Sequence, residues 1–160
     1  MKLAILAIGR LKTGPEKMLA SEYLTRIEGL GRKTGISGIT VSETVESQKP
    51  TALARQQEEA KHFASALPER ATTIVLDERG KSLTSQGFAN LLQKNIEGGT
   101  GELVFLIGGP DGHAEATKTN AVHLLSFGAM TWPHRLVRVM LLEQIYRAMT
   151  ILAGHPYHRP

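Results

Sequence analysis

The sequence predicts an α/β fold built on a mostly parallel sheet that is flanked by helices. Short apolar runs rich in β-branched residues alternate along the chain with longer amphipathic runs, which is the pattern of strand–helix–strand units. The run 103–107, Leu-Val-Phe-Leu-Ile, is apolar at every position, as expected for a parallel strand that helices cover on both faces. These two observations set the expected fold class.

Length and composition predict one globular domain over residues 1–160. The chain has 41% hydrophobic and 21% charged residues, close to an average folded chain, so dominant disorder is excluded. No apolar run approaches the roughly 18 residues that cross a bilayer, and the first run ends at Gly9, too soon for a signal peptide. We therefore expect a cytoplasmic protein with no membrane partner. The absence of cysteine excludes disulfides, Cys-ligated zinc and a thiol nucleophile.

The first half of the chain predicts two strands and two helices. Residues 2–8 form an apolar strand, and Thr13-Gly14-Pro15-Glu16 has the spacing of a capping box, so a helix should begin there. Its inward face is expected to carry Leu19, Tyr23 and Ile27. A short strand at 36–41, a polar loop at 42–49 and a helix at 52–66 follow, and that helix should face inward through Leu53, Ala60, Phe63 and Ala64.

The second half alternates more clearly. A strand at 72–76 ends at the charged turn 77–80. Thr84 is a suitable N-cap for the next helix, with Leu83 and Phe88 placed as a hydrophobic staple around it. The elements expected after that helix are the strand 103–107, a helix near 113–122, an apolar segment at 124–130 and a long helix at 133–152.

A glycine-rich turn, Gly108-Gly109-Pro110-Asp111-Gly112, directly follows the buried strand. In open α/β sheets, ligands bind beyond the carboxyl ends of strands, and glycines there let a ligand approach backbone amides. The turn matches neither the phosphate-binding P-loop nor the dinucleotide fingerprint. It is a candidate ligand-binding loop, and a tight turn required only by geometry is the alternative.

The segment 125–133, Leu-Ser-Phe-Gly-Ala-Met-Thr-Trp-Pro, leads into the last helix. Its side chains Phe127, Met130 and Trp132 could line an apolar pocket suited to an aromatic ring. Taken alone, the segment fits a strand that packs into the core. The nearby glycine turn is what favours a pocket.

The helix predicted at 133–152 is apolar on two sides. Besides one broad apolar arc, Leu136, Met140 and Ile151 stand among its polar residues. Such a helix needs a second surface to bury it, which predicts a homodimer with twofold symmetry. Arg138 falls inside the apolar arc, where an unpaired charge is unfavourable. We expect Arg138 to be paired across the interface or exposed in a cleft, and we favour the cleft.

Positive charge concentrates at the C-terminus. Residues 131–160 hold four arginines, no lysine and one acid, together with three of the six histidines. Tyr157 can stack on a base, His158 can exchange a proton near neutral pH, and Arg159 can hold an anionic group. A solvated basic tail is the alternative. A zinc site at His155 and His158 is not expected, because no carboxylate is near them in the sequence.

Taken together, these motifs resemble the ribosomal RNA large subunit methyltransferase H family, a SPOUT-class family that methylates N3 of a pseudouridine in 23S ribosomal RNA. The matching motifs are 107–112, 125–127, 130–134, 136–139, 143–148 and 155–159. The resemblance implies S-adenosylmethionine as cofactor, no metal, a C-terminal trefoil knot, and a homodimer that acts on 23S ribosomal RNA within the assembled ribosome. It places the cofactor against Leu76, Gly108, Phe127, Gly128, Ala129, Met130, Thr131 and Trp132.

For the reaction, we assign His158 as the base or proton relay at N3, and Arg159 or Arg138 as the cation that stabilises the anionic ring. Tyr157 and His134 are assigned to the substrate. In a dimer whose tails cross over, one protomer would bind the cofactor and the other would supply these groups. Two alternatives of other classes stay open: an RNA-binding module without catalysis, and a small-molecule nucleotide enzyme that uses the glycine turn.

Overall fold

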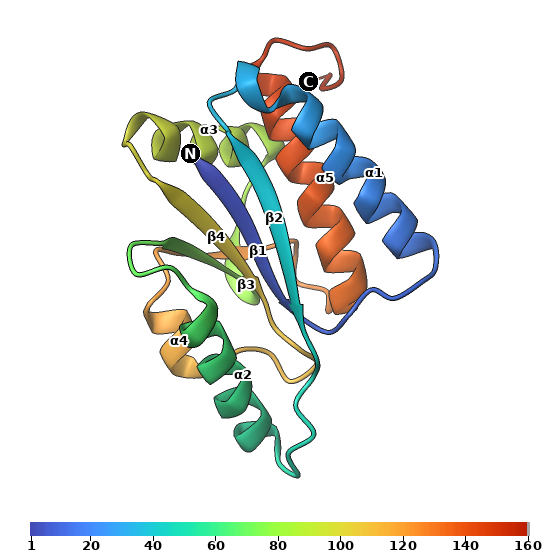
Figure 1. Cartoon of the computed structure of the whole chain (residues 1–160), viewed down its shortest axis with the longest axis vertical. Helices are drawn as coiled ribbons and strands as arrows, with labels where there is room; N and C mark the ends of the chain where they lie inside the picture. Colours follow the sequence, from blue (N-terminus) through green and yellow to red (C-terminus); the bar gives the residue numbers. More distant parts are fainter. Residues whose placement is uncertain (160) are drawn as a thin grey trace.

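The computed structural model describes residues 1–159, and Pro160, the last residue of the expected domain, lies outside them. Its sheet has the strand order β2-β1-β4-β3-β5, and every neighbouring pair is parallel, which confirms the predicted fold class (Figure 1). The strands are β1 (Lys2–Ile8), β2 (Gly38–Thr44), β3 (Thr72–Ser82), β4 (Glu102–Ile107) and β5 (His123–Ser126). The helices are α1 (Pro15–Leu30), α2 (Ala52–Ala66), α3 (Ser85–Glu97), α4 (Glu115–Thr119) and α5 (His134–Leu152), with a short 3-10 turn at Gly31–Lys33. The trefoil knot implied by the family resemblance stays a prediction.

Two apolar clusters lie on the two faces of the sheet, because successive side chains of a strand point to opposite faces. One cluster joins alternate residues of β1 and β4, such as Leu3 and Phe105, to buried side chains of α1, α3 and α5. The other joins the intervening residues, such as Leu6 and Val104, to Phe63 of α2. The whole of Leu103–Ile107 is buried, as the continuous apolar run predicts.

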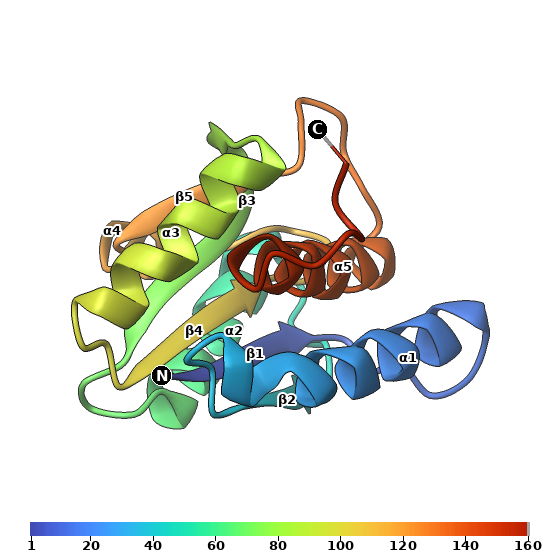
Figure 2. The same cartoon turned by 90° about the horizontal axis from the view of Figure 1, so that it is seen from above.

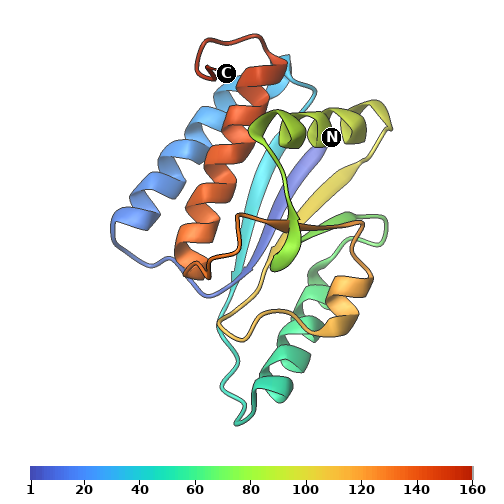
Figure 3. The same cartoon turned by 180° about the vertical axis from the view of Figure 1, so that it is seen from behind.

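Helix α5 lies between α1 and α3 on one face of the sheet, whereas α2 lies on the other face (Figures 2 and 3). Its buried positions include Leu141, Ile145 and Met149 at helical spacing. The predicted helix 133–152 is therefore correct to within one residue at its start. No helix in the described residues is long and apolar enough to span a membrane.

Helix starts follow the predicted caps in one case and not in another. Thr84 caps α3, since its hydroxyl accepts the Gly87 N–H at 3.0 Å. The capping box at the start of α1 is wrong: Gly14 occupies the N-cap position, no side chain caps it, and Pro15 begins the helix. The extended backbone at Gly14, with φ of 104°, is one that a threonine or another L-residue rarely adopts.

The inward faces of α1 and α2 differ from the predicted ones. In α1 the buried residues are Ala20 and Ile27, whereas Leu19 is exposed. In α2 Phe63 is buried as predicted, but Leu53 is 63% exposed and Glu59 is buried in place of an apolar residue. A carboxylate thus occupies the inward face of α2, and the functional site explains its presence there.

Strand β3 continues past the predicted turn at residues 77–80 and bends there. Its pairing with β5 shifts register between Leu76 and Lys81, which both lie opposite Leu125. Gly80 sits in the bend, and a β-carbon at Gly80 would lie 2.7 Å from the carbonyl carbon of Leu124. Only a residue without a side chain lets the two strands approach this closely.

Replacing Gly80 by alanine is expected to lower the free energy of unfolding by about 1–3 kcal/mol, because β5 must move to make room for the methyl group. Gly29→Ala is the matched control: nothing lies within 4 Å of a β-carbon at that position on α1, so the helix should gain up to about 1 kcal/mol. Urea unfolding of both variants measures the difference, and equal stability of the two would contradict the steric account.

Candidate functional site

A cavity of about 640 Å³ opens at the edge of the sheet where the parallel strands end. It is lined by Leu76 of β3, by Ile107 of β4 and the glycine turn 108–112, and by the chain between β5 and α5. Ligands of open α/β sheets bind at this carboxyl edge, and the volume is in the range of pockets that hold small molecules, about 300–1,000 Å³. We therefore take this cavity, called the edge cavity below, as the candidate site.

The edge cavity brings together most of the residues expected to contact a cofactor. Those that line it are Leu76, Gly108, Phe127, Gly128, Met130, Thr131 and Trp132. Ala129 is exposed and does not line it. The alternative, a strand that packs into the core, is correct only for β5, in which Leu125 and Ser126 are buried. The residues after β5 do not pack into the core, since Met130 and Trp132 are 71% and 40% exposed.

Hydrogen bonds of Ser126 fix the chain that follows β5. Its hydroxyl accepts the Gly128 N–H at 3.1 Å and lies 2.9 Å from the Gly128 carbonyl and 3.2 Å from the Glu78 carbonyl. Thr131 donates its hydroxyl to the Glu78 carboxylate at 3.2 Å. These hydrogen bonds tie residues 125–133, called the pocket segment below, to the bend of β3, the strand that also carries Leu76.

The glycine turn is clamped from the other side by α2. Arg55 donates two hydrogen bonds to Asp111, at 2.6 and 2.8 Å, and Gln56 donates to the Asp111 carbonyl at 2.6 Å. The paired guanidinium holds the pKa of the Asp111 carboxyl below its usual value. Bidentate contact between a guanidinium and a carboxylate fixes both position and direction, so the turn has a defined place relative to the strand ends.

Glu59, one helical turn after Arg55, explains why α2 presents a carboxylate to the interior. Its oxygens would lie 3.1 Å from a β-carbon at Gly109, so the turn approaches the carboxylate through a residue with no side chain. Glu59 also accepts the Ser47 N–H at 3.2 Å. Burial raises the pKa of Glu59, and its hydrogen bonds with the Ser47 and Gly109 backbone oppose that rise. The carboxylate connects the glycine turn to the loop after β2.

His113 follows the glycine turn and is buried beside Gly108 and Phe63. The ring centroids of His113 and Phe63 are 5.6 Å apart, and a β-carbon at Gly108 would lie 3.0 Å from the His113 Nε2 atom. Neither ring nitrogen has a hydrogen-bond partner among the described residues. Burial lowers the pKa of His113 from 6.5 to about 4, so the ring is uncharged at neutral pH.

Arg138 is not exposed in a cleft, and its placement was predicted wrongly. It is 1% exposed and pairs within its own chain with Glu43 at the end of β2. It also donates to the Gly9 carbonyl at 2.8 Å. Burial lowers the pKa of its guanidinium and the neighbouring Glu43 carboxylate opposes that effect. In the single chain Arg138 anchors α5 to the ends of β1 and β2 and offers no surface to a substrate.

His134 stands one turn before Arg138, at the start of α5, and lines the edge cavity. Its Nε2 atom lies 3.4 Å from a carboxylate oxygen of Glu46. Burial lowers the pKa of His134 while Glu46 acts in the opposite direction. The expected substrate residue His134 is therefore at the site, next to Trp132.

The other expected substrate and catalytic residues follow α5 in the sequence, and two of them contact its middle and second half. Tyr157 donates its hydroxyl to Glu143 at 3.2 Å, and Arg147 lies over the Tyr157 ring at 4.8 Å and donates to His158 Nδ1 at 3.4 Å. Burial raises the pKa of the Tyr157 phenol above its usual value. The 19-residue α5 is about 28 Å long, and the tail follows its C-terminal end (Figure 1). The edge cavity is lined by residues at the start of α5. Tyr157, His158 and Arg159 are not brought together with the edge cavity of the same chain.

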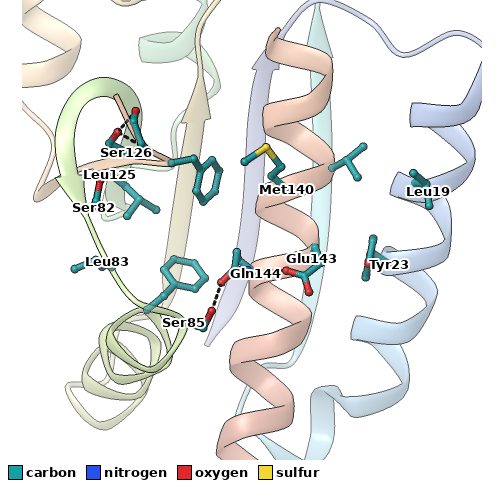
Figure 4. Close-up of a pocket in the computed structure, with 14 residues that line it drawn as sticks. Leu19, Tyr23, Ser82, Leu83, Ser85, Leu125, Ser126, Met140, Glu143 and Gln144 are labelled. Atoms are coloured by element: carbon teal, nitrogen blue, oxygen red, sulfur yellow. Dashed lines mark hydrogen bonds between the residues drawn. The ribbon is translucent and has the colours of Figure 1, made fainter. Parts of the chain in front are cut away.

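A second cavity, of about 500 Å³, opens beside the middle of α5 (Figure 4). In this view α5 carries Met140, Glu143 and Gln144 between Leu19 and Tyr23 of α1 and the chain around Ser85, whose hydroxyl donates to Gln144 at 3.0 Å. With Leu136 exposed nearby on the same helix, this uncovered surface of α5 carries apolar side chains beside the polar Glu143 and Gln144. The two-sided character predicted for the helix is present.

The charges around the edge cavity are mixed. Its lining carries three carboxylates, Asp77, Glu78 and Asp111, and two cations, Arg79 and Lys118. Within residues 1–159 no group of three or more His, Asp or Glu side chains is arranged to hold a metal ion.

Sequence patterns missed the residues that hold the site in place. Arg55, Gln56 and Glu59 lie on a helix whose inward face was assigned by hydrophobicity, so polar residues there were overlooked. The signal that could have found them is the i, i+4, i+8 spacing of Arg55, Glu59 and Phe63, which puts these residues on one face of the helix. Glu43 and Glu46 carry no local signal, because their partners on α5 are about ninety residues away along the chain.

Comparisons with known proteins find relatives over nearly the whole chain. A family model described as predicted SPOUT methyltransferase matches residues 1–158. The protein called ribosomal RNA large subunit methyltransferase H in Rhodopseudomonas palustris (strain BisA53) is 50% identical over 159 residues, covering 99% of both chains. Proteins with the same name in Bradyrhizobium diazoefficiens and Brucella anthropi are 46% and 45% identical, also over 99% of both chains.

A solved structure, the SpoU methyltransferase AviRb from Streptomyces viridochromogenes in complex with the cofactor AdoMet, matches with a TM-score of 0.43 and 14% identity. The match covers 90% of this chain and 56% of that protein.

Acidification should lower the free energy of unfolding, because the buried His113 ring binds a proton less readily than the same ring in the unfolded chain. Because its folded-state pKa of about 4 lies below the unfolded value of 6.5, the unfolded chain binds the proton first, and stability that is complete above pH 6.5 is lost as the pH falls toward 4. The loss approaches roughly 3 kcal/mol. His113→Leu should remove this part of the pH dependence.

The measurement is the free energy of unfolding in urea at pH 7 and pH 5 for both proteins. The raised pKa of Glu59 acts in the opposite direction but is shared by both, so it cancels in the comparison. An identical pH dependence of the two proteins would mean that His113 is not held uncharged by burial.

Removing the charge of Glu43 should leave the Arg138 guanidinium buried without its anion. Glu43→Gln is expected to lower the free energy of unfolding by on the order of 2–3 kcal/mol, and to weaken cofactor affinity because α5 loses its anchor at the edge cavity. Glu22→Gln is the control, since it breaks an exposed Arg–Glu pair on α1 that contributes less than about 1 kcal/mol. If the two variants were equally stable, the anchoring role of Arg138 would be refuted.

Proposed function

Because this chain belongs to the SPOUT methyltransferase family, we propose that it transfers a methyl group from S-adenosylmethionine to N3 of a pseudouridine in the 23S RNA of the large ribosomal subunit. The relatives that share 45–50% of its sequence over their whole length carry the name ribosomal RNA large subunit methyltransferase H. The observation that supports the proposal most directly is the edge cavity, which gathers seven of the eight residues expected at the cofactor around the glycine turn.

The residues of the edge cavity fit S-adenosylmethionine. Its aromatic and apolar side chains, such as Phe127 and Leu76, suit an adenine ring. Gly108 and Gly109 let the turn pack closely against His113 and Glu59, because a β-carbon at either position would press on those side chains. This packing fixes the backbone of the turn where it lines the cavity. When bound, the cofactor supplies an electrophilic methyl group on a positively charged sulfur. The uncharged state of His113 and the carboxylates Asp77 and Glu78 suit that positive charge.

We assign the acceptor side mostly to residues that do not line the edge cavity of their own chain. We propose that His158 takes the N3 proton of the pseudouridine, that Arg159 stabilises the negative charge left on the ring, and that Tyr157 and His134 hold the base. His134 is at the cavity, whereas Tyr157 and His158 contact Glu143 and Arg147 in the middle and second half of α5. None of the three tail residues lines the cavity of its own chain. We therefore propose a homodimer in which the tail of one protomer completes the site of the other.

Helix α5 supplies a surface for such a dimer. Its exposed Leu136, together with Val139 and Met140 beside the second cavity, would be covered by a second copy of the chain. Arg138 stays an internal anchor and takes no part in this proposal as a catalytic group. We also propose that the chain forms a single domain and that it acts in the cytoplasm, where ribosomes assemble.

The experiment is transfer of tritiated methyl groups from S-adenosylmethionine to ribosomes isolated from a strain that lacks the gene, compared with free ribosomal RNA. We expect label in the 23S RNA of ribosomes and much less in free RNA. Calorimetric titration with the cofactor separates the alternatives. An RNA-binding module would bind RNA but not S-adenosylmethionine, and a small-molecule nucleotide enzyme would bind ATP or NAD and ignore RNA.

The tail residues should affect the reaction without affecting the cofactor. His158→Ala is expected to lower the rate of methyl transfer by roughly 10²–10⁴-fold with unchanged S-adenosylmethionine affinity, and Arg159→Ala should weaken ribosome binding with a smaller salt dependence. The control is His62→Ala, an exposed histidine on α2. A wild-type rate for His158→Ala with intact RNA binding would remove His158 as the base.

A further inference from the structure

A basic depression of about 440 Å³ lies beside the edge cavity, and none of the expected functional residues accounts for it. Three cations line it: Arg10 and Lys12 from the loop after β1, and Arg135 from the first turn of α5. The remaining lining residues are Gly9, Thr13, Val45, Glu46 and Gln48. Two elements that are distant in the sequence, the loop after β1 and the start of α5, thus place like charges around one hollow.

The three cations of the basic depression are exposed, and none of them forms an ion pair among the described residues. Elsewhere in the molecule, Arg55 and Arg147 each contact a carboxylate within 3 Å. The only acid in the lining, Glu46, faces His134 at 3.4 Å. The depression therefore carries a net positive charge that an anion outside the chain could neutralise.

The basic depression shares a wall with the edge cavity. A β-carbon at Gly9, which lines the depression, would lie 2.7 Å from Nε2 of His134, which lines the edge cavity. Arg135, the next residue of α5, lines the depression. A nucleotide whose base enters the edge cavity past His134 would therefore hold its sugar–phosphate chain over these cations.

We propose that the basic depression binds backbone phosphates of the RNA substrate on one side of the target nucleotide, an inference that rests on the proposed function. Two guanidinium groups can each hold a phosphate through paired hydrogen bonds, and the Lys12 ammonium adds a point charge. Contacts of this kind carry no sequence information but fix the position of the RNA. They orient the target base toward the edge cavity, whereas the tail residues act on the base itself.

The test compares the double variant Arg10→Gln/Arg135→Gln with the control Arg70→Gln/Lys94→Gln. The control residues are exposed cations near the amino ends of β3 and β4, at the opposite edge of the sheet. Each protein is titrated with isolated large subunits, and with a ribosomal RNA fragment, over a range of salt concentrations. Methyl transfer and cofactor affinity are measured in parallel.

For the double variant we expect KM for ribosomes to rise roughly tenfold with kcat changed less than about twofold, and the slope of log affinity against log salt to fall by about two. Cofactor affinity should be unchanged, and the control should match the wild type. Equal KM and equal salt slope in the two double variants would overturn the proposal.

Other outcomes are equally decisive. If the double variant lost affinity for large subunits but kept its affinity and salt slope for the RNA fragment, the depression would face an acidic protein surface, and the assignment to RNA would be wrong. If the wild type bound RNA without methylating it, the proposed function would fail, while the difference in salt slope would still decide the role of the depression.

Discussion

The arrangement of the site depends on one buried contact, between Arg138 of α5, Glu43 of β2 and the carbonyl of Gly9 after β1. A guanidinium that is 1% exposed is stable only with an anionic partner and hydrogen bonds, since the desolvation of an unpaired charge costs several kcal/mol. The contact therefore sets where α5 begins relative to the ends of the strands. The pocket segment, the edge cavity and the basic depression all border that point.

Two further clamps complete the frame around the edge cavity. Arg55, Gln56 and Glu59 hold the glycine turn from α2, and Ser126 holds the chain after β5 against the bend of β3. Preorganised backbone groups and fixed side chains are what a site needs to place a methyl group in line with its acceptor. The frame is rigid at the start of α5, and the tail residues proposed to act on the acceptor base do not line the edge cavity. This separation is why we propose that the tail of a second chain completes the site.

Local patterns predicted the elements but not the contacts between them. The apolar run Leu103–Ile107 and the cap at Thr84 are visible in a few neighbouring residues, and both were correct. Arg138 was recognised as a charge in an apolar arc, yet its partner Glu43 lies 95 residues away, and no periodicity reports a pairing at that distance. The inward face of α2 was misassigned for a related reason: hydrophobicity selected Leu53, whereas the glycine turn required Glu59. The cofactor residues were named from family resemblance, and the sequence pattern alone left their segment between pocket and core.

The central claim is that the edge cavity of one chain works with the tail of another. It is tested most directly with a hybrid dimer, co-expressed with two tags, in which one chain carries Gly108→Val and the other ends after Pro156. Each altered chain alone should be inactive on ribosomes, whereas the purified hybrid should show roughly half of the wild-type methyl transfer, since one of its two sites combines an intact cavity with an intact tail. A hybrid as inactive as either parent would contradict the account.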